Sequence, residues 1–195
     1  SACRKHHPHK IPPEAVKGVL DLTDWDFAKD GPVDLRGEYE FYWKQFLDPM
    51  EFSKTAPPQK KGFIKVPSYW NNYEIEGRKL PGDGYATYRL TIFLDAQKEP
   101  LAMRLKEIST AYTLLVNSKK ITSVGLTGKT RETTIPGYFR HVVDFEPTAK
   151  RFDIILHVSN FHHRRGGVWE GIQLGKEKDI RQIQERRISF DFFLF

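Results

Sequence analysis

Tyr85-Ala-Thr-Tyr-Arg-Leu-Thr-Ile-Phe-Leu94 is the stretch that decides the fold of this chain. Apolar and polar side chains alternate along it, so that Tyr88 and Leu90 fall on one face and Thr87 and Arg89 on the other. A repeat of two residues is typical of a β-strand with one face buried. We therefore predict a strand here, with its apolar face turned toward a core.

The same pattern recurs on both sides of this stretch, with turn signals such as Pro81-Gly-Asp-Gly84 between the segments. Further strands are predicted at 18–22, 33–43, 63–67, 101–105, 111–116, 138–145, 152–158 and 168–174. Residues 48–62 are rich in Pro and Lys and are predicted to form a loop. Many short strands without a convincing helix between them predict an all-β fold, an antiparallel β-sandwich of the jelly-roll, galactose-binding-domain-like type.

The two ends of the chain differ from this pattern. Residues 1–14 carry clustered His, Pro and basic residues and are predicted to be a flexible lead before a sandwich domain at 15–176. His6, His7 and His9 are candidate metal ligands. His clusters in tails are usually solvated, so we expect no metal site. Residues 177–195 are charged and then strongly aromatic, which predicts a short helical or extended juxtamembrane tail.

Composition narrows the classes of function. The chain has 195 residues, which suits one domain, and its single cysteine, Cys3, permits no internal disulfide. The net charge of +6 is scattered rather than gathered in a stripe, so no nucleic-acid partner is expected. No nucleophile, zinc or phosphate-loop motif is present, and no pairing among the carboxylates is visible. We therefore expect no enzyme activity and no cofactor.

Two polar, aromatic loops, 68–73 and 160–169, are the candidate ligand site. Aromatic faces can pack on the C–H surface of a sugar, and planar polar groups can hold its vicinal hydroxyls. Glu107 and Arg140 are added as a plausible acceptor and donor near strand ends. The predicted ligand-binding residues are Trp70, Tyr73, Glu107, Arg140, Asn160, His162, Arg164 and Trp169.

Each candidate has a structural alternative. Trp70 and Trp169 could be core or rim packing, and Asn160 could hold a turn through its own side chain. His162 and His163 are adjacent, so in an extended chain they point apart and cannot both face one ligand.

Several motifs follow one another in a single order over about residues 15–176. They are Gly18–Leu22, Val33–Trp43, Val66-Pro67 with Trp70, Gly84–Leu90, Ile108–Tyr112 with Val116-Asn117, and Val158–Phe161 with Gly166–Trp169 and Leu174-Gly175. Their order resembles the extracellular jelly-roll domain of bacterial seven-transmembrane receptors with diverse intracellular signalling modules. More distantly, the succession of a strand, a Pro-x-x-Trp loop, a Tyr-Arg strand and an Asn turn is similar to the sugar-binding domain of family 2 glycoside hydrolases.

The resemblance implies a sensory domain on the extracytoplasmic, periplasmic face of the bacterial cytoplasmic membrane. A first transmembrane helix would follow the tail, and the partner would be a carbohydrate or another small polar ligand, neutral or anionic. Two alternatives stay open. One is an interaction or homodimerisation domain without a small ligand, and the other is a carbohydrate-binding module accessory to a glycosidase.

Overall fold

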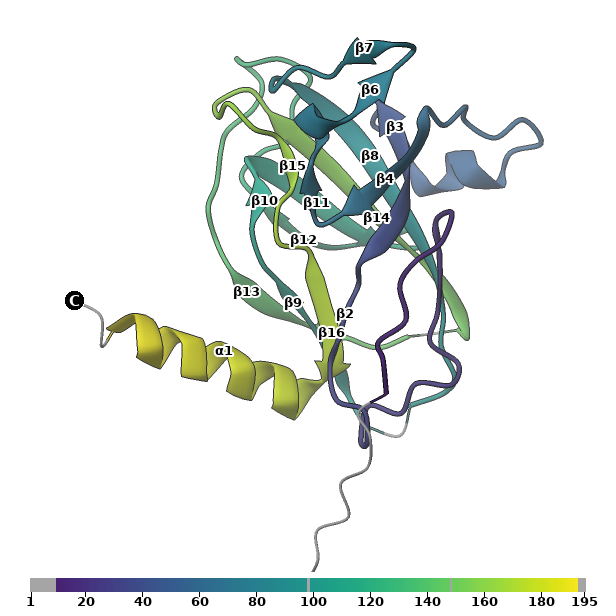
Figure 1. Cartoon of the computed structure of the whole chain (residues 1–195), viewed down its shortest axis with the longest axis vertical. Coiled ribbons are helices and arrows are strands. Elements are labelled where there is room, and N and C mark those ends of the chain that lie inside the picture. The colour runs from purple at the N-terminus through teal and green to yellow at the C-terminus, as the bar shows by residue number, and fades with distance from the viewer. Residues whose placement is uncertain (1–9, 98, 148, 193–195) are drawn as a thin grey trace, which may run out of the picture.

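The computed structural model describes residues 10–97, 99–147 and 149–192, and in them the chain is an antiparallel β-sandwich with a C-terminal helix (Figure 1). The predicted fold class is confirmed. Among the described residues, the larger layer is a seven-stranded sheet. Its strands are β12 (Lys119–Val124), β11 (Ala111–Val116), β14 (Arg151–Asn160), β8 (Gly84–Phe93), β3 (Gly37–Trp43) and β4 (Gly62–Val66), with β1 (Val19–Asp21) beside β8.

The opposite layer has four strands, and two smaller sheets extend the sandwich at one end. The four-stranded sheet runs β13 (His141–Phe145), β9 (Leu101–Leu105), β16 (Ile172–Lys176) and β2 (Val33–Asp34). The smaller sheets are β10 (Ile108–Ser109), β15 (Gly167–Val168) and β5 (Ser68–Tyr69), and the pair β6 (Glu74–Ile75) and β7 (Arg78–Lys79). Short 3₁₀ turns, η1 (Pro49–Ser53) and η2 (Trp70–Asn72), lie in the connections.

The central strand β8 has the alternation that its sequence predicts. Tyr88, Leu90 and Ile92 are buried in the core between the layers. On the other face, the guanidinium of Arg89 reaches Asp153 at 2.6 Å and Glu40 at 3.2 Å. The outer face is therefore polar but paired, which is what a half-buried strand requires. The parallel pairing of β1 with β8 is an exception to the antiparallel order.

Two predicted strands are divided in the structure. The stretch 33–43 forms β2 and β3, and these pair in different sheets, so the chain crosses from one layer to the other between them. The stretch 168–174 is divided into β15 and β16 by Gly171, whose φ of +76° is costly for other residues. Strands β5, β6, β7, β10 and β12 are not among the predicted strands, and β5 lies in the predicted loop 68–73.

The charged part of the tail forms helix α1 (Glu177–Phe192), which follows β16 directly. Ile180 is fully buried against the four-stranded sheet, and the side chain of Gln184 accepts a hydrogen bond from Arg104 of β9 at 2.8 Å. Arg181 pairs with Asp144 of β13. The helix therefore packs on the outer face of the smaller layer. The described residues contain no helix with the length and apolarity needed to cross a membrane.

Candidate binding site

The two predicted loops do pack against each other, but their polar groups are used to hold the loops. The Asn160 side chain is fully buried; it donates to the carbonyls of Gly82 and His163 and accepts from the backbone N–H of His163 at 3.1 Å. Asn71 links the loops by donating to the carbonyl of Arg164 at 3.1 Å. Asn160 is therefore structural, and its prediction as a ligand contact is wrong because no part of it is exposed.

Trp70 is also a structural residue rather than a binding surface. Its side chain has 0% exposure, and its indole N–H donates to the carbonyls of Pro81 at 3.0 Å and Gly82 at 3.1 Å. A Cβ on Gly166 would lie 2.2 Å from the Trp70 ring, so the glycine permits this close approach. The predicted ligand contact of Trp70 is corrected to core packing.

The other predicted residues of these loops lie at the surface or half-buried. Trp169 is half-buried between the rings of Tyr69 at 5.3 Å and His163 at 4.7 Å, so neighbouring rings flank it. Tyr73 is half-buried, and its hydroxyl accepts from the backbone N–H of Lys65 at 2.8 Å. The remaining two predicted residues, His162 and Arg164, are exposed.

Glu107 and Arg140 are brought together at a separate cavity of about 340 Å³. The guanidinium nitrogen Nη2 of Arg140 lies 3.2 Å from Oε2 of Glu107 and 3.0 Å from Oε2 of Glu170. All three side chains are partly exposed. One guanidinium thus orients two carboxylates, that of Glu107 in the cavity lining and that of Glu170 beside it.

Three strands of the smaller layer position this charged group. Glu107 follows the end of β9, Arg140 directly precedes β13, and Glu170 lies just before β16. The backbone N–H groups of Trp169 and Glu170 both donate to the carbonyl of Glu107 at 3.0 Å. The carboxylate-bearing segments are therefore fixed to each other by main-chain hydrogen bonds.

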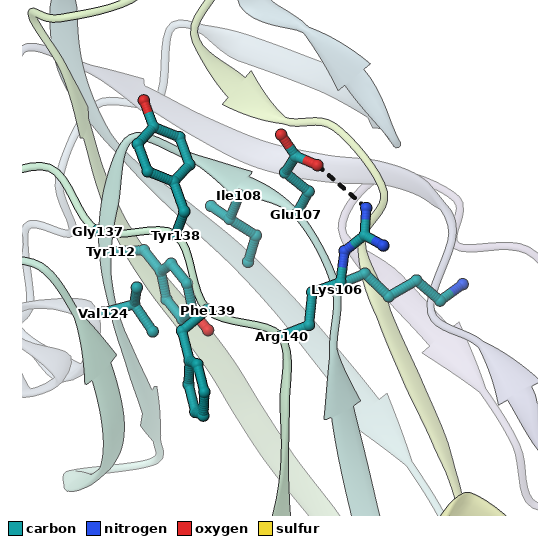
Figure 2. A pocket seen from close by; sticks show the side chains of 9 residues that line it. All are labelled: Lys106, Glu107, Ile108, Tyr112, Val124, Gly137, Tyr138, Phe139 and Arg140. Atoms are coloured by element: carbon teal, nitrogen blue, oxygen red, sulfur yellow. Dashed lines mark hydrogen bonds and ion pairs between the residues drawn. The ribbon is translucent and has the colours of Figure 1, made fainter. Parts of the chain in front are cut away.

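The cavity combines an apolar floor with exposed aromatic rings. Figure 2 shows Ile108 between the Glu107–Arg140 pair on one side and the rings of Tyr138 and Phe139 on the other. Tyr138 is 65% and Phe139 67% exposed, which is unusual for large rings beside a well-formed core. The cavity is lined by Lys106, Glu107, Ile108, Tyr112, Val124, Gly137, Tyr138, Phe139 and Arg140.

A buried hydroxyl among the lining residues has no partner in the described part of the protein. Tyr112 is 1% exposed, and its hydroxyl makes no hydrogen bond to any described residue. Burial raises the pKa of Tyr112 well above its usual value, so the group stays protonated and can both donate and accept. Buried polar groups normally find partners, so the Tyr112 hydroxyl is an exception; it has almost no exposed surface and lies beneath the lining of the cavity.

His141 lies at the edge of the same region. Its ring stacks on Phe139 with centroids 5.2 Å apart, and Nε2 lies 2.9 Å from the hydroxyl of Thr122. Burial lowers the pKa of His141, and a hydrogen bond from the ring to the backbone of Phe139 partly opposes this shift. The neutral ring therefore supports Phe139 near neutral pH.

The sequence did not single out Tyr138, Phe139 or Tyr112 as site residues. A signal existed in the run Gly137-Tyr-Phe-Arg140, where two aromatic residues and an arginine adjoin a glycine. The sequence predicted a strand from 138, whereas β13 begins at His141 and leaves these residues in the preceding connection. Within the described residues, no three His, Cys, Asp or Glu side chains gather as metal ligands. His6, His7 and His9 lie outside the described residues.

Comparison with solved structures shows a likeness to bacterial β-glucuronidases. A β-glucuronidase of Ruminococcus gnavus matches with a TM-score of 0.52 and 16% identity, over 73% of this chain and 28% of that enzyme. A β-glucuronidase of an uncultured Clostridium matches with a TM-score of 0.55 and 13% identity, again over 73% of this chain and 28% of that enzyme. The likeness is one of fold.

This likeness agrees with the more distant resemblance drawn from the sequence, that to glycoside hydrolases, and does not extend to the receptor family. The chain corresponds to little more than a quarter of the matched enzymes. No family model matches the sequence, and no curated protein sequence matches it.

Proposed function

We propose that this chain is a saccharide-binding domain whose site is the cavity at Glu107, Tyr138, Phe139 and Arg140. The observation that carries the proposal is the combination at one cavity of an oriented ion pair, Glu107 with Arg140, and the two exposed rings of Tyr138 and Phe139. Exposed rings can cover the C–H face of a pyranose, and oriented charged groups can hold its hydroxyls. The structural likeness to β-glucuronidases adds fold-level support.

A recognition role is favoured over catalysis at this cavity. Glu107 accepts a hydrogen bond from the Arg140 guanidinium and Glu170 forms an ion pair with it, an arrangement that fixes acceptor geometry for recognition. We therefore propose that the chain is a non-catalytic binding module. It would bind saccharides either independently of an enzyme or as an accessory to a glycosidase.

Truncation of the two exposed rings tests the site. Tyr138→Ala and Phe139→Ala should each weaken a saccharide identified on a glycan array by about tenfold, because one stacking face is worth roughly 1–3 kcal/mol including its buried area. Met50→Ala is the matched control, since Met50 is 72% exposed, lies in η1 between β3 and β4 and is not among the lining residues. Unchanged affinity in both ring variants would place the saccharide elsewhere.

We propose, as a second candidate, that the domain is the extracytoplasmic sensor of a bacterial membrane receptor. The observation that favours it is that β9, β13 and β16 all begin or end beside the charged group and all contact helix α1. A ligand that changes the Arg140 bridge would act on strands that hold the helix through Gln184 and Arg181. The partners would be the membrane, through helices after residue 195, and a second copy of the chain.

Amide spectra of α1 test the sensor candidate. Addition of a bound saccharide should shift or broaden the backbone signals of residues 178–186, because a sensor must couple its two arrangements to the ligand. Asp144→Asn should reduce those shifts while leaving affinity unchanged. Shifts confined to the cavity lining would argue for a binding module without signal transfer.

A further inference from the structure

The charges at the cavity bear on which saccharides it can accept. Arg140 is shared by Glu107 and Glu170, so one guanidinium and two carboxylates leave one negative charge. Lys106 is the other cation of the described lining, and its ammonium lies 2.9 Å from Oδ1 of Asp34. Figure 2 shows the Lys106 ammonium directed away from Tyr138 and Phe139. Both cations of the described lining are therefore already neutralised.

A ligand carboxylate would meet an unfavourable site. Recognition of a uronate normally uses a guanidinium that is available for two parallel hydrogen bonds to the carboxylate. Here the Nη2 nitrogen of Arg140 already serves Glu107 and Glu170, and a third carboxylate would add a second negative charge in excess. Releasing Arg140 from its partners would in turn leave two carboxylates without a counter-charge.

Uncharged hydroxyls fit the groups that remain. The carboxylate oxygens of Glu107 in the lining can accept further hydrogen bonds from sugar hydroxyls, since each oxygen has more than one lone pair. Tyr138 and Phe139 supply apolar faces that carry no charge.

We infer that the cavity binds uncharged saccharides and discriminates against uronates, although the structurally similar enzymes are β-glucuronidases. This inference rests on the proposed saccharide-binding function of the cavity and adds the charge class of its ligand. The discrimination arises because Glu107 and Glu170 neutralise the positive charge of Arg140.

The probes are the methyl glycosides of glucose, galactose and mannose, and those of the three matching uronic acids. Each pair differs in the oxidation state of one carbon and in one negative charge. Binding to the whole chain is followed by protein-observed NMR titration at neutral pH. At least one neutral glycoside should bind at the cavity, with its uronate about tenfold weaker or more, because like charges repel in a partly desolvated site.

The paired variant Glu107→Gln with Glu170→Gln tests the cause. It keeps side-chain size and frees the charge of Arg140, so the preference for the neutral probe should shrink or reverse. The control is Glu76→Gln with Asp95→Asn, which removes two carboxylates paired with Lys61 and Lys150 outside the cavity lining. Thermal unfolding of both variants checks that they fold, and the control should keep the wild-type preference.

The outcomes separate the two proposals. Equal or tighter binding of the uronate by the wild-type protein, with signals shifting at the cavity, would overturn the charge inference and leave saccharide binding intact. A preference that survives Glu107→Gln with Glu170→Gln in a folded protein would also overturn it. Signals that stay fixed at the cavity for all six probes and for the glycan array would remove the proposed function and the inference with it.

Discussion

The loops at 68–73 and 160–169 and the cavity at Glu107 and Arg140 contain the same kinds of residue but use them differently. In the loops, the polar groups of Asn160 and Asn71 are satisfied by loop backbone, and Trp70 has no exposed face. At the cavity, aromatic rings are open to solvent and a buried hydroxyl has no partner among the described residues. Residue composition alone therefore does not identify a binding surface. A binding surface is identified by which aromatic faces stay exposed and which polar groups lack a protein partner.

Removing the central ring of the loop region should have the largest effect on stability. Trp70→Ala would delete a fully buried ring and its two hydrogen bonds, and we expect a loss of about 3–5 kcal/mol of unfolding free energy. Tyr138→Ala at the cavity should change stability by no more than about 0.5 kcal/mol, because that ring is largely exposed. Urea denaturation of both variants measures the contrast, and similar losses would remove the distinction between the regions.

Removing the buried amide of the loop region should have the next largest effect. Asn160→Ala would leave the His163 N–H and the Gly82 carbonyl without this partner, at a cost of about 1–3 kcal/mol. Asn72→Ala is the matched control, because Asn72 is exposed in the neighbouring loop. Chemical denaturation decides, and a loss below about 0.5 kcal/mol for Asn160→Ala would mean that water replaces the amide.

The two arginines give the most direct comparison of binding. Arg140→Ala should abolish saccharide binding and change stability by about 1 kcal/mol or less, since the ion pairs are partly exposed. Arg164→Ala should leave both properties near wild type, because Arg164 is an exposed side chain of the structural loop. Calorimetric titration with the identified saccharide is the measurement. Loss of binding in Arg164→Ala would move the site back to the loops predicted from sequence.

The smallest expected effect is a dependence of stability on pH. Burial lowers the pKa of His157 and of His141 below about 6.5, so the folded protein binds fewer protons than the unfolded chain in this window. Stability should therefore fall as the pH falls from about 6.5 toward 5, above the range where carboxylates titrate. His157→Gln should flatten this fall in the melting temperature, and His162→Gln, at an exposed position, should not. A melting temperature that rises on acidification would contradict the sign.

The central strands could be predicted from the sequence because alternation of period two specifies which face of a strand is buried. Tyr88 and Leu90 are buried where the pattern of Tyr85–Leu94 places them. Alternation does not report which sheet a strand joins, so the crossing between β2 and β3 could not be seen in the stretch 33–43.

The site was only partly accessible from the sequence. Glu107 and Arg140 were named separately, but they are 33 residues apart, and their contact depends on the pairing of β13 with β9. Tyr138 and Phe139 were not named, because an exposed ring and a core ring look the same in a sequence. Trp70 was named for the same reason, although its ring is entirely within the core.

Helix α1 acts geometrically as a lever that is held to the smaller sheet at Ile180, Arg181 and Gln184. Its 16 residues span about 24 Å, and the part beyond Gln184 accounts for about 12 Å of that length. Figure 1 shows the helix projecting outward from the foot of the smaller sheet. A tilt of about 5° at Gln184 would carry the far end of the helix through about 1 Å. Small adjustments of β9, β13 and β16 are thus enlarged at the far end of the helix.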